Sequence, residues 1–214
     1  MKKGVGNMNL NVEVIATAIG TFLAGAYICY KVCKQHIDQF LKNWQGSVST
    51  KVPKQSAIDI KILNRMEEVK EIMDADRVHV YEFHNGEHYA NGRSALKVSC
   101  TYEVCRAGVH SIQRESMSVP ISIMPRYIAM ILDNSIVDIV DINTIKDTMP
   151  ATYNMKISQS IKAYTNVVIM NSLKEPVGFI EVQWFDKSKY VKNDHELLRL
   201  AAFIEENILN VDKK

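Results

Sequence analysis

This sequence has little of what marks the commonest functional classes. The net charge is only +2 over 214 residues, so no charge excess points to nucleic acid or another polyanion as a partner. None of its four cysteines is separated from another by two residues, which excludes the usual zinc fingers. The sequence also contains no G-x-S-x-G, H-E-x-x-H, Walker-type or G-x-G-x-x-G motif. We therefore expect a protein that is not an enzyme and that binds no nucleic acid.

The few cysteines also bear on the compartment. They form two close pairs, Cys29 with Cys33 and Cys100 with Cys105. The first pair lies in a very apolar segment, so only the second could form a disulfide in a soluble part of the chain. We expect free thiols in a reducing compartment, with a disulfide between Cys100 and Cys105 as the open alternative.

One long uncharged apolar run is present, at residues 14–30, and it ends at Lys31. A transmembrane helix takes roughly 17 to 25 residues, so this run allows one membrane span. A signal peptide is the alternative, because Lys2 and Lys3 precede the run and residues 24–26 resemble a cleavage site. The run continues past that site and ends at basic residues, which favours a membrane anchor.

The cations beside the run predict its orientation. Two lie before it and three after it: Lys2, Lys3, Lys31, Lys34 and Lys42. Because loops on the cytoplasmic side carry the excess of Lys and Arg, this count places the large C-terminal part in the cytoplasm. The expected localisation is the inner (cytoplasmic) membrane, with a single pass.

Small residues at four-residue spacing share one face of the predicted span: Ala16, Gly20 and Ala24. Such a face lets two helices approach closely, which favours a homodimer. Small residues are also common in membrane spans generally, so the face has a purely compositional explanation as well.

The remaining chain predicts a juxtamembrane helix and linker at residues 34–54 and one domain at residues 55–214, after a tail and span at residues 1–33. The linker is expected at residues 46–53, which contain Gly46 and Pro53. After it, apolar residues recur every three or four positions and predict an amphipathic helix: Ile58, Ile62, Met66, Val69 and Met73.

The domain alternates strand and helix patterns. Alternating or continuous apolar residues predict strands at 77–84, 94–101, 136–140, 163–170 and 176–185. Helices are predicted at 122–133 and 150–157, and a last one is opened by the capping-box pair Asn193 and Glu196. The predicted class is α+β, with an antiparallel sheet flanked by helices.

The C-terminal third carries a family resemblance. The segment 136–142 (IVDIVDI), then AYTNVVIMNSLKEPVGFIEVQWFD and then NDHELLRLAAFIEENI resemble the GAF domain. The strand at 77–83 behind an amphipathic helix is similar to the opening of that family. The resemblance covers residues 56–211 and implies a sensory or binding module, often dimeric, that holds a small ligand over its sheet. The sequence has no NKFDE-like series and no chromophore-attachment context at Cys100 or Cys105, so the cofactor or ligand stays unknown.

A second resemblance is to those phage holins that have one N-terminal span and a large soluble domain. It is carried by Trp184-Phe185-Asp186 and by Asn193-Asp194-His195-Glu196. It implies a lysis-regulating membrane protein whose soluble domain lies outside the inner membrane. The cation count opposes that orientation.

The candidate ligand site lies around the first predicted hairpin, whose loop is more polar than a turn requires. Its loop residues are His84, Asn85, His88, Tyr89, Asn91 and Arg93, and the segment after the second strand adds Tyr102, Glu103, Cys105 and Arg106. Such side chains suit a small polar or anionic ligand, and we expect the two groups to meet at one site. The alternative is that a long hairpin needs polar residues to satisfy its own backbone.

Two chemical alternatives use the same loop. His84 and His88, with Glu87 or a cysteine, could bind a metal, but Gly86 disfavours the helix that would align them. Cys105 with a histidine could act as nucleophile and base. A cysteine more often packs as a small apolar group, so we expect neither a metal site nor a catalytic residue here.

Overall fold

The computed structural model describes residues 6–209, with side chains described for residues 14–41 and 52–208. The chain divides into two compact units, Met1–Ser56 and Ala57–Lys214. The first helix, α1 (Gly6–Ile72), contributes to both units. The first unit contains the predicted apolar helix: the stretch Val14–Leu41 is exposed, and long and apolar enough to be a membrane span or a signal sequence.

Helix α1 is continuous through residues 46–53, where Gly46 and Pro53 predicted an interruption. One proline removes one helical hydrogen bond and one glycine costs about 1 kcal/mol, which a long helix tolerates. Two of the cations used to predict orientation, Lys2 and Lys3, lie outside the described residues, as does the side chain of Lys42.

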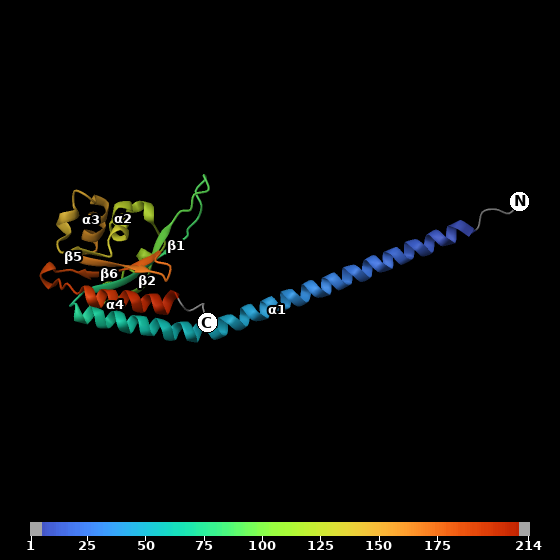
Figure 1. Ribbon diagram of the computed structural model, residues 1–214, viewed down its shortest axis with the longest axis horizontal. Helices are drawn as coiled ribbons and strands as arrows, with labels where there is room; N and C mark the ends of the chain where they lie inside the picture. The colour runs from blue at the N-terminus through green and yellow to red at the C-terminus, as the bar shows by residue number, and fades with distance from the viewer. Residues whose placement is uncertain (1–5, 210–214) are drawn as a thin grey trace. The chain divides into compact units, whose positions relative to one another are not determined.

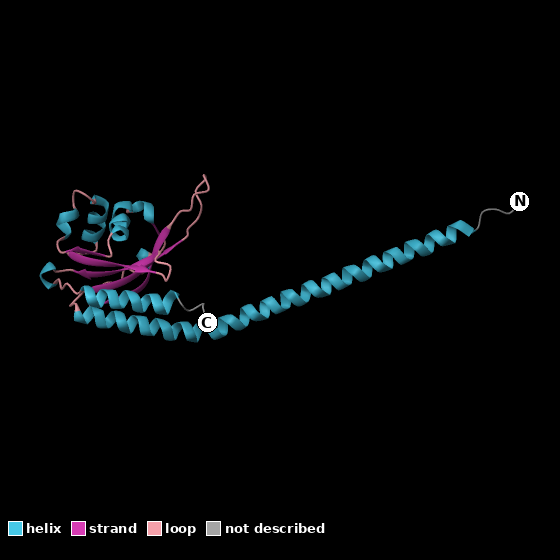
Figure 2. Cartoon of the chain, in the orientation of Figure 1, coloured by secondary structure: helices cyan, strands magenta, loops and turns pink. Residues whose placement is uncertain are grey.

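The second unit is built on a six-stranded antiparallel sheet (Figures 1 and 2). Its spatial order is β3-β2-β1-β6-β5-β4. The bounds are β1 Arg77–His84, β2 Lys97–Cys105, β3 Val119–Pro120, β4 Ile136–Ile139, β5 Ala163–Met170 and β6 Pro176–Trp184. The central place of β1, between β2 and β6, confirms what its two apolar faces predicted.

One face of the sheet is covered by the C-terminal part of α1 and by α4 (Asp194–Ile204), which lie side by side in Figure 1. The predicted apolar stripe of α1 is confirmed, because Ile62, Met66, Val69 and Met73 are fully buried. They pack against the even-numbered residues of β1 and β6, such as Val80 and Ile180.

The other face is covered by α2 (Pro125–Asp133) and α3 (Pro150–Ser158), with the short 3₁₀ helix Ile142–Ile145 beside them (Figure 2). Its apolar cluster takes the odd-numbered residues of β1 and β6 together with the helices' inner faces, and includes Tyr127, Ile131 and Phe179. Three short 3₁₀ segments complete the unit, at Arg114–Ser116, Ile121–Ile123 and Lys187–Lys189, and a π-helical turn, Glu205–Leu209, follows α4.

The predicted hairpin and closing helix of the last third are confirmed. Strand β5 has the predicted bounds and pairs with β6 from Ala163 opposite Trp184 to Met170 opposite Pro176. The capping prediction holds, since the Asn193 side chain accepts a hydrogen bond from the amide of Glu196 at 3.2 Å.

Strand β2 starts and ends later than the predicted strand at 94–101. Residues 85–96 leave the sheet as a long loop, with a single isolated bridge between His88 and Ser94. Pairing with β1 resumes at Lys97 and continues to Cys105, because Val104 packs into the core beneath α1. Residues 102–105 therefore belong to the strand and not to a segment beyond it.

Candidate functional site

Buried polar side chains gather on the sheet face beneath α2 and α3. They occupy alternate positions of three adjacent strands and are completely inaccessible to solvent: His79 of β1, Asn166 of β5, and Glu181 and Gln183 of β6. Side chains alternate between the two faces of a strand, so their neighbours Val78, Val80, Ile180 and Val182 face the apolar core on the other side.

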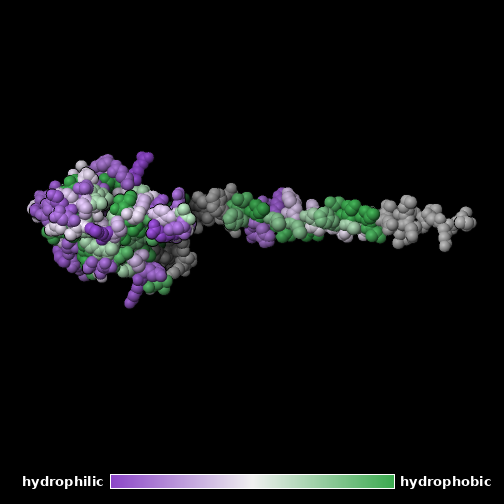
Figure 3. All heavy atoms as spheres, turned by 90° about the horizontal axis from the view of Figure 1, so that it is seen from above, coloured by the Kyte–Doolittle hydropathy of each residue, from purple (hydrophilic) through white to green (hydrophobic). Residues whose placement is uncertain are grey.

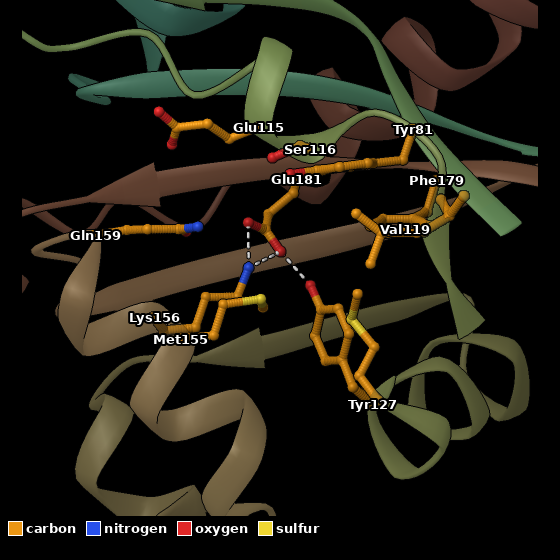
Figure 4. Close-up of a pocket in the computed structure, with 12 residues that line it drawn as sticks. Tyr81, Glu115, Ser116, Val119, Tyr127, Met155, Lys156, Gln159, Phe179 and Glu181 are labelled. Carbon is orange, nitrogen blue, oxygen red and sulfur yellow. Dashed lines mark hydrogen bonds and ion pairs between the residues drawn. The ribbon is translucent and has the colours of Figure 1, made fainter. Parts of the chain in front are cut away.

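In this group, Glu181 also contacts Lys156 and Tyr127 from the covering helices (Figure 4). The Lys156 ammonium reaches it from α3, with Nζ 2.5 Å from Oε2, and the Tyr127 hydroxyl of α2 donates to the same carboxylate. Gln183 also donates to it. The Lys156 and Glu181 side chains are 3% and 0% exposed, so this ion pair is fully desolvated.

The burial of these groups moves their pKa values. Desolvation lowers the pKa of Lys156, and the attraction of Glu181 opposes that shift. Burial alone would raise the pKa of Glu181, but the charges of Lys156 and His79 and the hydrogen bonds from Lys156 and Tyr127 together outweigh it and hold that pKa below its usual range. Burial raises the pKa of the Tyr127 phenol, so Tyr127 stays a hydrogen-bond donor at neutral pH.

A cavity of about 190 Å³ opens beside this cluster, between the sheet and helices α2 and α3. Its apolar walls include Tyr81 and Phe179, whose rings stack at 4.8 Å. Its residues are Tyr81, Val98, Glu115, Ser116, Val119, Met124, Tyr127, Met155, Lys156, Gln159, Phe179 and Glu181. The cavity thus combines aromatic and aliphatic walls with one buried cation and one buried carboxylate.

A second, more polar cavity of about 460 Å³ adjoins the first, since Glu115 and Gln159 line both. Arg77 lies at its base, where the guanidinium donates to the His110 carbonyl at 3.0 Å and sits over the Phe185 ring.

A second buried ionic cluster lies below this cavity. Glu103 accepts from His79 Nε2 at 2.8 Å and lies 3.8 Å from Arg77 Nε. Gln183 Nε2 lies 3.2 Å from His79 Nδ1 and joins this cluster to Glu181. A continuous hydrogen-bonded chain therefore connects Glu181, which lines the first cavity, to Glu103.

The predicted loop residues lie at the tip and base of the projecting β1–β2 connection (Figure 1). His84 Nε2 lies 2.8 Å from the Ser99 hydroxyl, and Asn91 accepts from the amide of Arg93 at 3.1 Å within the turn. The Arg93 guanidinium covers the Tyr89 ring at 4.9 Å, and both side chains line an open depression of about 340 Å³. Asn85 and His88 are exposed.

The other predicted residues lie at the opposite end of the hairpin, because Arg77 pairs with Cys105 while His84 pairs with Lys97. The expectation that the two groups meet at one site is wrong, since an antiparallel strand separates its two ends by about 3.4 Å per residue.

Three of these four residues bond to separate partners. Tyr102 donates to Asp59 of α1 at 2.7 Å, Arg106 bonds Asp74, and Glu103 belongs to the buried cluster. Cys105 is half-buried, and all four cysteines are free.

Of the residues around the cavity, sequence reasoning missed Lys156, Glu181 and Tyr127. One signal was available for Glu181, which stands alone as a charge in the apolar strand VGFIEVQW. Lys156 and Tyr127 lie in helices where a polar residue ordinarily faces solvent, so no local pattern distinguishes them.

Among the residues whose side chains are described, no group of three or more His, Cys, Asp or Glu is arranged to hold a metal ion. Two buried polar atoms near Lys156, the Tyr164 hydroxyl and Asn166 Nδ2, have no hydrogen-bond partner within this described part of the chain.

The sequence matches no known family profile and no curated protein. Solved structures do match its fold. The blue-light-absorbing form of the PixJ GAF domain from Thermosynechococcus elongatus has a TM-score of 0.54 at 13% identity, covering 76% of this chain and 89% of that one. The phycocyanobilin-bound GAF domain of a cyanobacterial phytochrome has a TM-score of 0.52 at 14% identity, covering 77% and 93%.

The chromophore-binding domain of the bacteriophytochrome RpBphP3 from R. palustris has a TM-score of 0.54 at 14% identity, covering 80% of this chain and 63% of that one. At such identities the likeness concerns the fold alone. These matches agree with the six-stranded antiparallel sheet, its flanking helices and the resemblance seen in the C-terminal sequence. The C-terminal unit of this protein therefore has the GAF-domain fold.

Proposed function

We propose that this protein is a membrane-anchored sensory module that binds a small ligand in the cavity between its sheet and helices α2 and α3. It acts by binding and not by catalysis, as a homodimer, in the inner (cytoplasmic) membrane. Its GAF domain lies in the cytoplasm, and nucleic acid is not a partner.

The cavity of about 190 Å³ carries this proposal. An engineered apolar cavity of roughly 150 Å³ in another protein holds benzene, so this one has room for a molecule of about one ring. Ligand sites are typically apolar with a few converging polar groups, and here Lys156, Tyr127 and Glu181 converge on one wall. One matched structure of the same fold is described as phycocyanobilin-bound, which supports the use of this architecture to hold a small molecule.

The wall favours a polar, uncharged ligand over an anionic one. The Lys156 cation is already neutralised by Glu181, and Glu115 adds a second carboxylate at the rim. An anion entering this cavity would meet two carboxylates and a single paired cation, which costs free energy in a desolvated site. The hydroxyl of Ser116 and the amide of Gln159 offer hydrogen bonds to a neutral group.

The anchoring and dimer proposals rest on the first unit. The stretch Val14–Leu41 is apolar and exposed along its length, and Lys31 and Lys34 lie toward its C-terminal end. Hydropathy colours in Figure 3 show its apolar side chains on the surface of the helix. The lysines favour a cytoplasmic domain. The holin resemblance has no support from the fold matches, which are to sensory-type domains.

The test is a thermal-shift screen of the full chain in detergent with benzamide, phenol and benzoate. Met155→Trp reduces the space in the cavity, because Met155 is half-buried and lines its wall. We expect this change to weaken binding by about tenfold or more, since the indole occupies space that the ligand needs and forcing both into the cavity costs about 1 to 3 kcal/mol. The matched control, Met117→Trp, changes a residue that is 50% exposed and should leave binding intact.

A third variant separates the cavity from the projecting loop. Asn85→Ala with Arg93→Ala removes two loop groups and should leave the binding of these probes unchanged. Loss of binding in this loop variant, with normal binding in Met155→Trp, would move the ligand site to the loop. Absence of any stabilisation of the wild type by one-ring compounds would contradict the cavity as a ligand site.

A further inference from the structure

Lys156 is an unusual residue to find in the wall of a cavity. Its side chain extends from α3 toward the sheet, and the residue is 2% exposed. The amine lies 5.1 Å from the centroid of the Tyr127 ring and 5.0 Å from that of the Tyr164 ring. Lys70 is the other lysine that is almost fully buried among the residues described. It pairs with Glu67 and Glu71 of its own helix α1, on the far side of the sheet.

Stability alone does not account for the buried pair of Lys156 and Glu181. Replacing a buried ion pair by apolar residues of similar volume is often neutral or stabilising, because both charges lose their hydration. A purely structural wall could therefore be apolar here, as it is at Val98 and Phe179. Instead the pair places one primary amine, the only one among the residues that line this cavity, beside a carboxylate and a phenol.

We propose that Lys156 captures a small aromatic aldehyde or ketone in this cavity as a reversible Schiff base, with Glu181 as its counterion. The proposal rests on the cavity being the ligand site, and it adds the chemical class of the ligand and the atom that holds it. Carbonyl compounds with one ring match the size of the space, and Tyr81 and Phe179 provide the aromatic walls.

The reaction balances with the groups present. The Lys156 ammonium gives a proton to Glu181 across the 2.5 Å contact, and the freed lone pair forms the bond to the carbonyl carbon. The carbonyl oxygen then leaves as water with two of the three ammonium protons, which Glu181 relays to it. The third proton stays on the nitrogen of the iminium. No oxidant, reductant or metal is consumed.

The site favours both the free amine before capture and the iminium after it. Before capture, desolvation lowers the pKa of Lys156, which increases the fraction of neutral amine that can attack. After capture, the iminium has the same positive charge as the ammonium it replaced, so Glu181 is never left as an unpaired buried anion. The Tyr127 hydroxyl keeps its hydrogen bond to the carboxylate in both states.

The test uses the full chain in detergent with benzaldehyde and sodium cyanoborohydride, which converts the imine into a stable benzyl amine. Peptide mass spectrometry then compares Lys156 with Lys162, an exposed lysine just before β5. We expect Lys156 to be alkylated faster by about tenfold or more, because the cavity holds the aldehyde beside the Lys156 amine, whereas Lys162 does not line it. Equal or slower labelling of Lys156 in the wild type would overturn the proposal.

Two variants and a control compound show whether the effect depends on an imine at Lys156. Lys156→Arg keeps a cation beside Glu181 but cannot form an imine, so benzaldehyde should no longer raise the melting temperature beyond the shift given by benzyl alcohol. Lys162→Arg should behave as wild type. Benzyl alcohol has the same ring without a carbonyl. If it stabilises the wild type while Lys156 is not alkylated, the Schiff base is refuted and the ligand site stands; if neither compound acts, both proposals fail.

Discussion

At the scale of single residues, Glu103 shows how a predicted ligand group serves a different purpose. Its side chain is 3% exposed and accepts hydrogen bonds from His79, the Ser111 hydroxyl and the amide of Ile112. These contacts attach the segment after β2 to the sheet. Burial alone would raise the pKa of Glu103, but the hydrogen bonds from His79, Ser111 and Ile112 outweigh it and lower the pKa to about 2.

This shift predicts a pH dependence of stability. A carboxylate whose pKa is lowered on folding stabilises the native state above its unfolded pKa of 4.5, and that contribution is lost as the pH falls toward 2. The full shift corresponds to about 3 kcal/mol. Urea unfolding of wild type and Glu103→Gln should show a difference in the free energy of unfolding at pH 5. Below that pH the difference should shrink, because Gln does not titrate.

Other carboxylates, Glu181 among them, titrate in both proteins, so their contributions cancel in the comparison. If the difference in free energy stays the same from pH 6 to pH 3, the ionised form of Glu103 is not what the hydrogen bonds stabilise.

At the scale of elements, helix α4 is stabilised both by a local cap and by tertiary contacts. Asn193 caps its first turn, and Leu197, Leu200 and Ile204 are buried beside α1 and against the sheet. Arg65 of α1 connects to its first turn through an ion pair with Glu196, and Trp184 donates its indole N–H to the Met73 carbonyl at 3.0 Å. Helix α4 is therefore held both to the C-terminal part of α1 and to the sheet that the two helices cover.

The cap gives a testable prediction. Asn193→Ala leaves the amide of Glu196 without its side-chain acceptor and should lower the free energy of unfolding by about 1 kcal/mol. Asn193→Asp keeps an acceptor at the same position and should stay within a few tenths of a kcal/mol of wild type. Urea denaturation followed by circular dichroism measures both, and an Ala variant as stable as the Asp variant would show that the cap contributes nothing.

At the scale of the whole molecule, the chain divides into two compact units, one with the apolar helix and one with the GAF-domain fold. Figure 3 shows apolar side chains along part of α1 and mostly polar ones on the domain surface in view. This contrast supports an anchor and a water-facing domain, which is the organisation that the proposed sensory role requires. In that role, two copies would pair through the small-residue face of the span.

The dimer proposal can be tested with two matched glycines of the span. A Cβ added at Gly20 or at Gly25 would meet nothing within 4 Å in a single chain, so the two positions are equally open to substitution. Gly20 lies on the face shared with Ala16 and Ala24, and Gly25 does not. Gly20→Leu should reduce cross-linked dimer in membranes by roughly tenfold, equivalent to about 1.4 kcal/mol of helix packing.

Gly25→Leu should leave the yield of cross-linked dimer at the wild-type level. Equal loss in both variants would mean that the whole span and not this face is sensitive, and no loss in either would place the dimer contact elsewhere.

Local patterns in the sequence determined much of the fold. The pattern of apolar residues predicted strands β1, β5 and β6, and the 3.6-residue period of apolar residues in α1 predicted its buried face. Both predictions hold because burial of an apolar face determines which side chains point inward. The capping pair at Asn193 likewise defined the start of α4. These features depend on neighbours within a few residues, which is the range over which periodicity and capping act.

Only the tertiary structure decided the candidate site. Lys156, Glu181 and Tyr127 come from three separate elements, and their meeting depends on how α2 and α3 cross the sheet, which no local pattern contains. The same applies to the predicted loop residues and to Tyr102, Glu103, Cys105 and Arg106, which antiparallel pairing places at opposite ends of one hairpin. The two groups are close in the sequence, which suggested one site. In the structure they are separated by the length of strand β2, which runs between them.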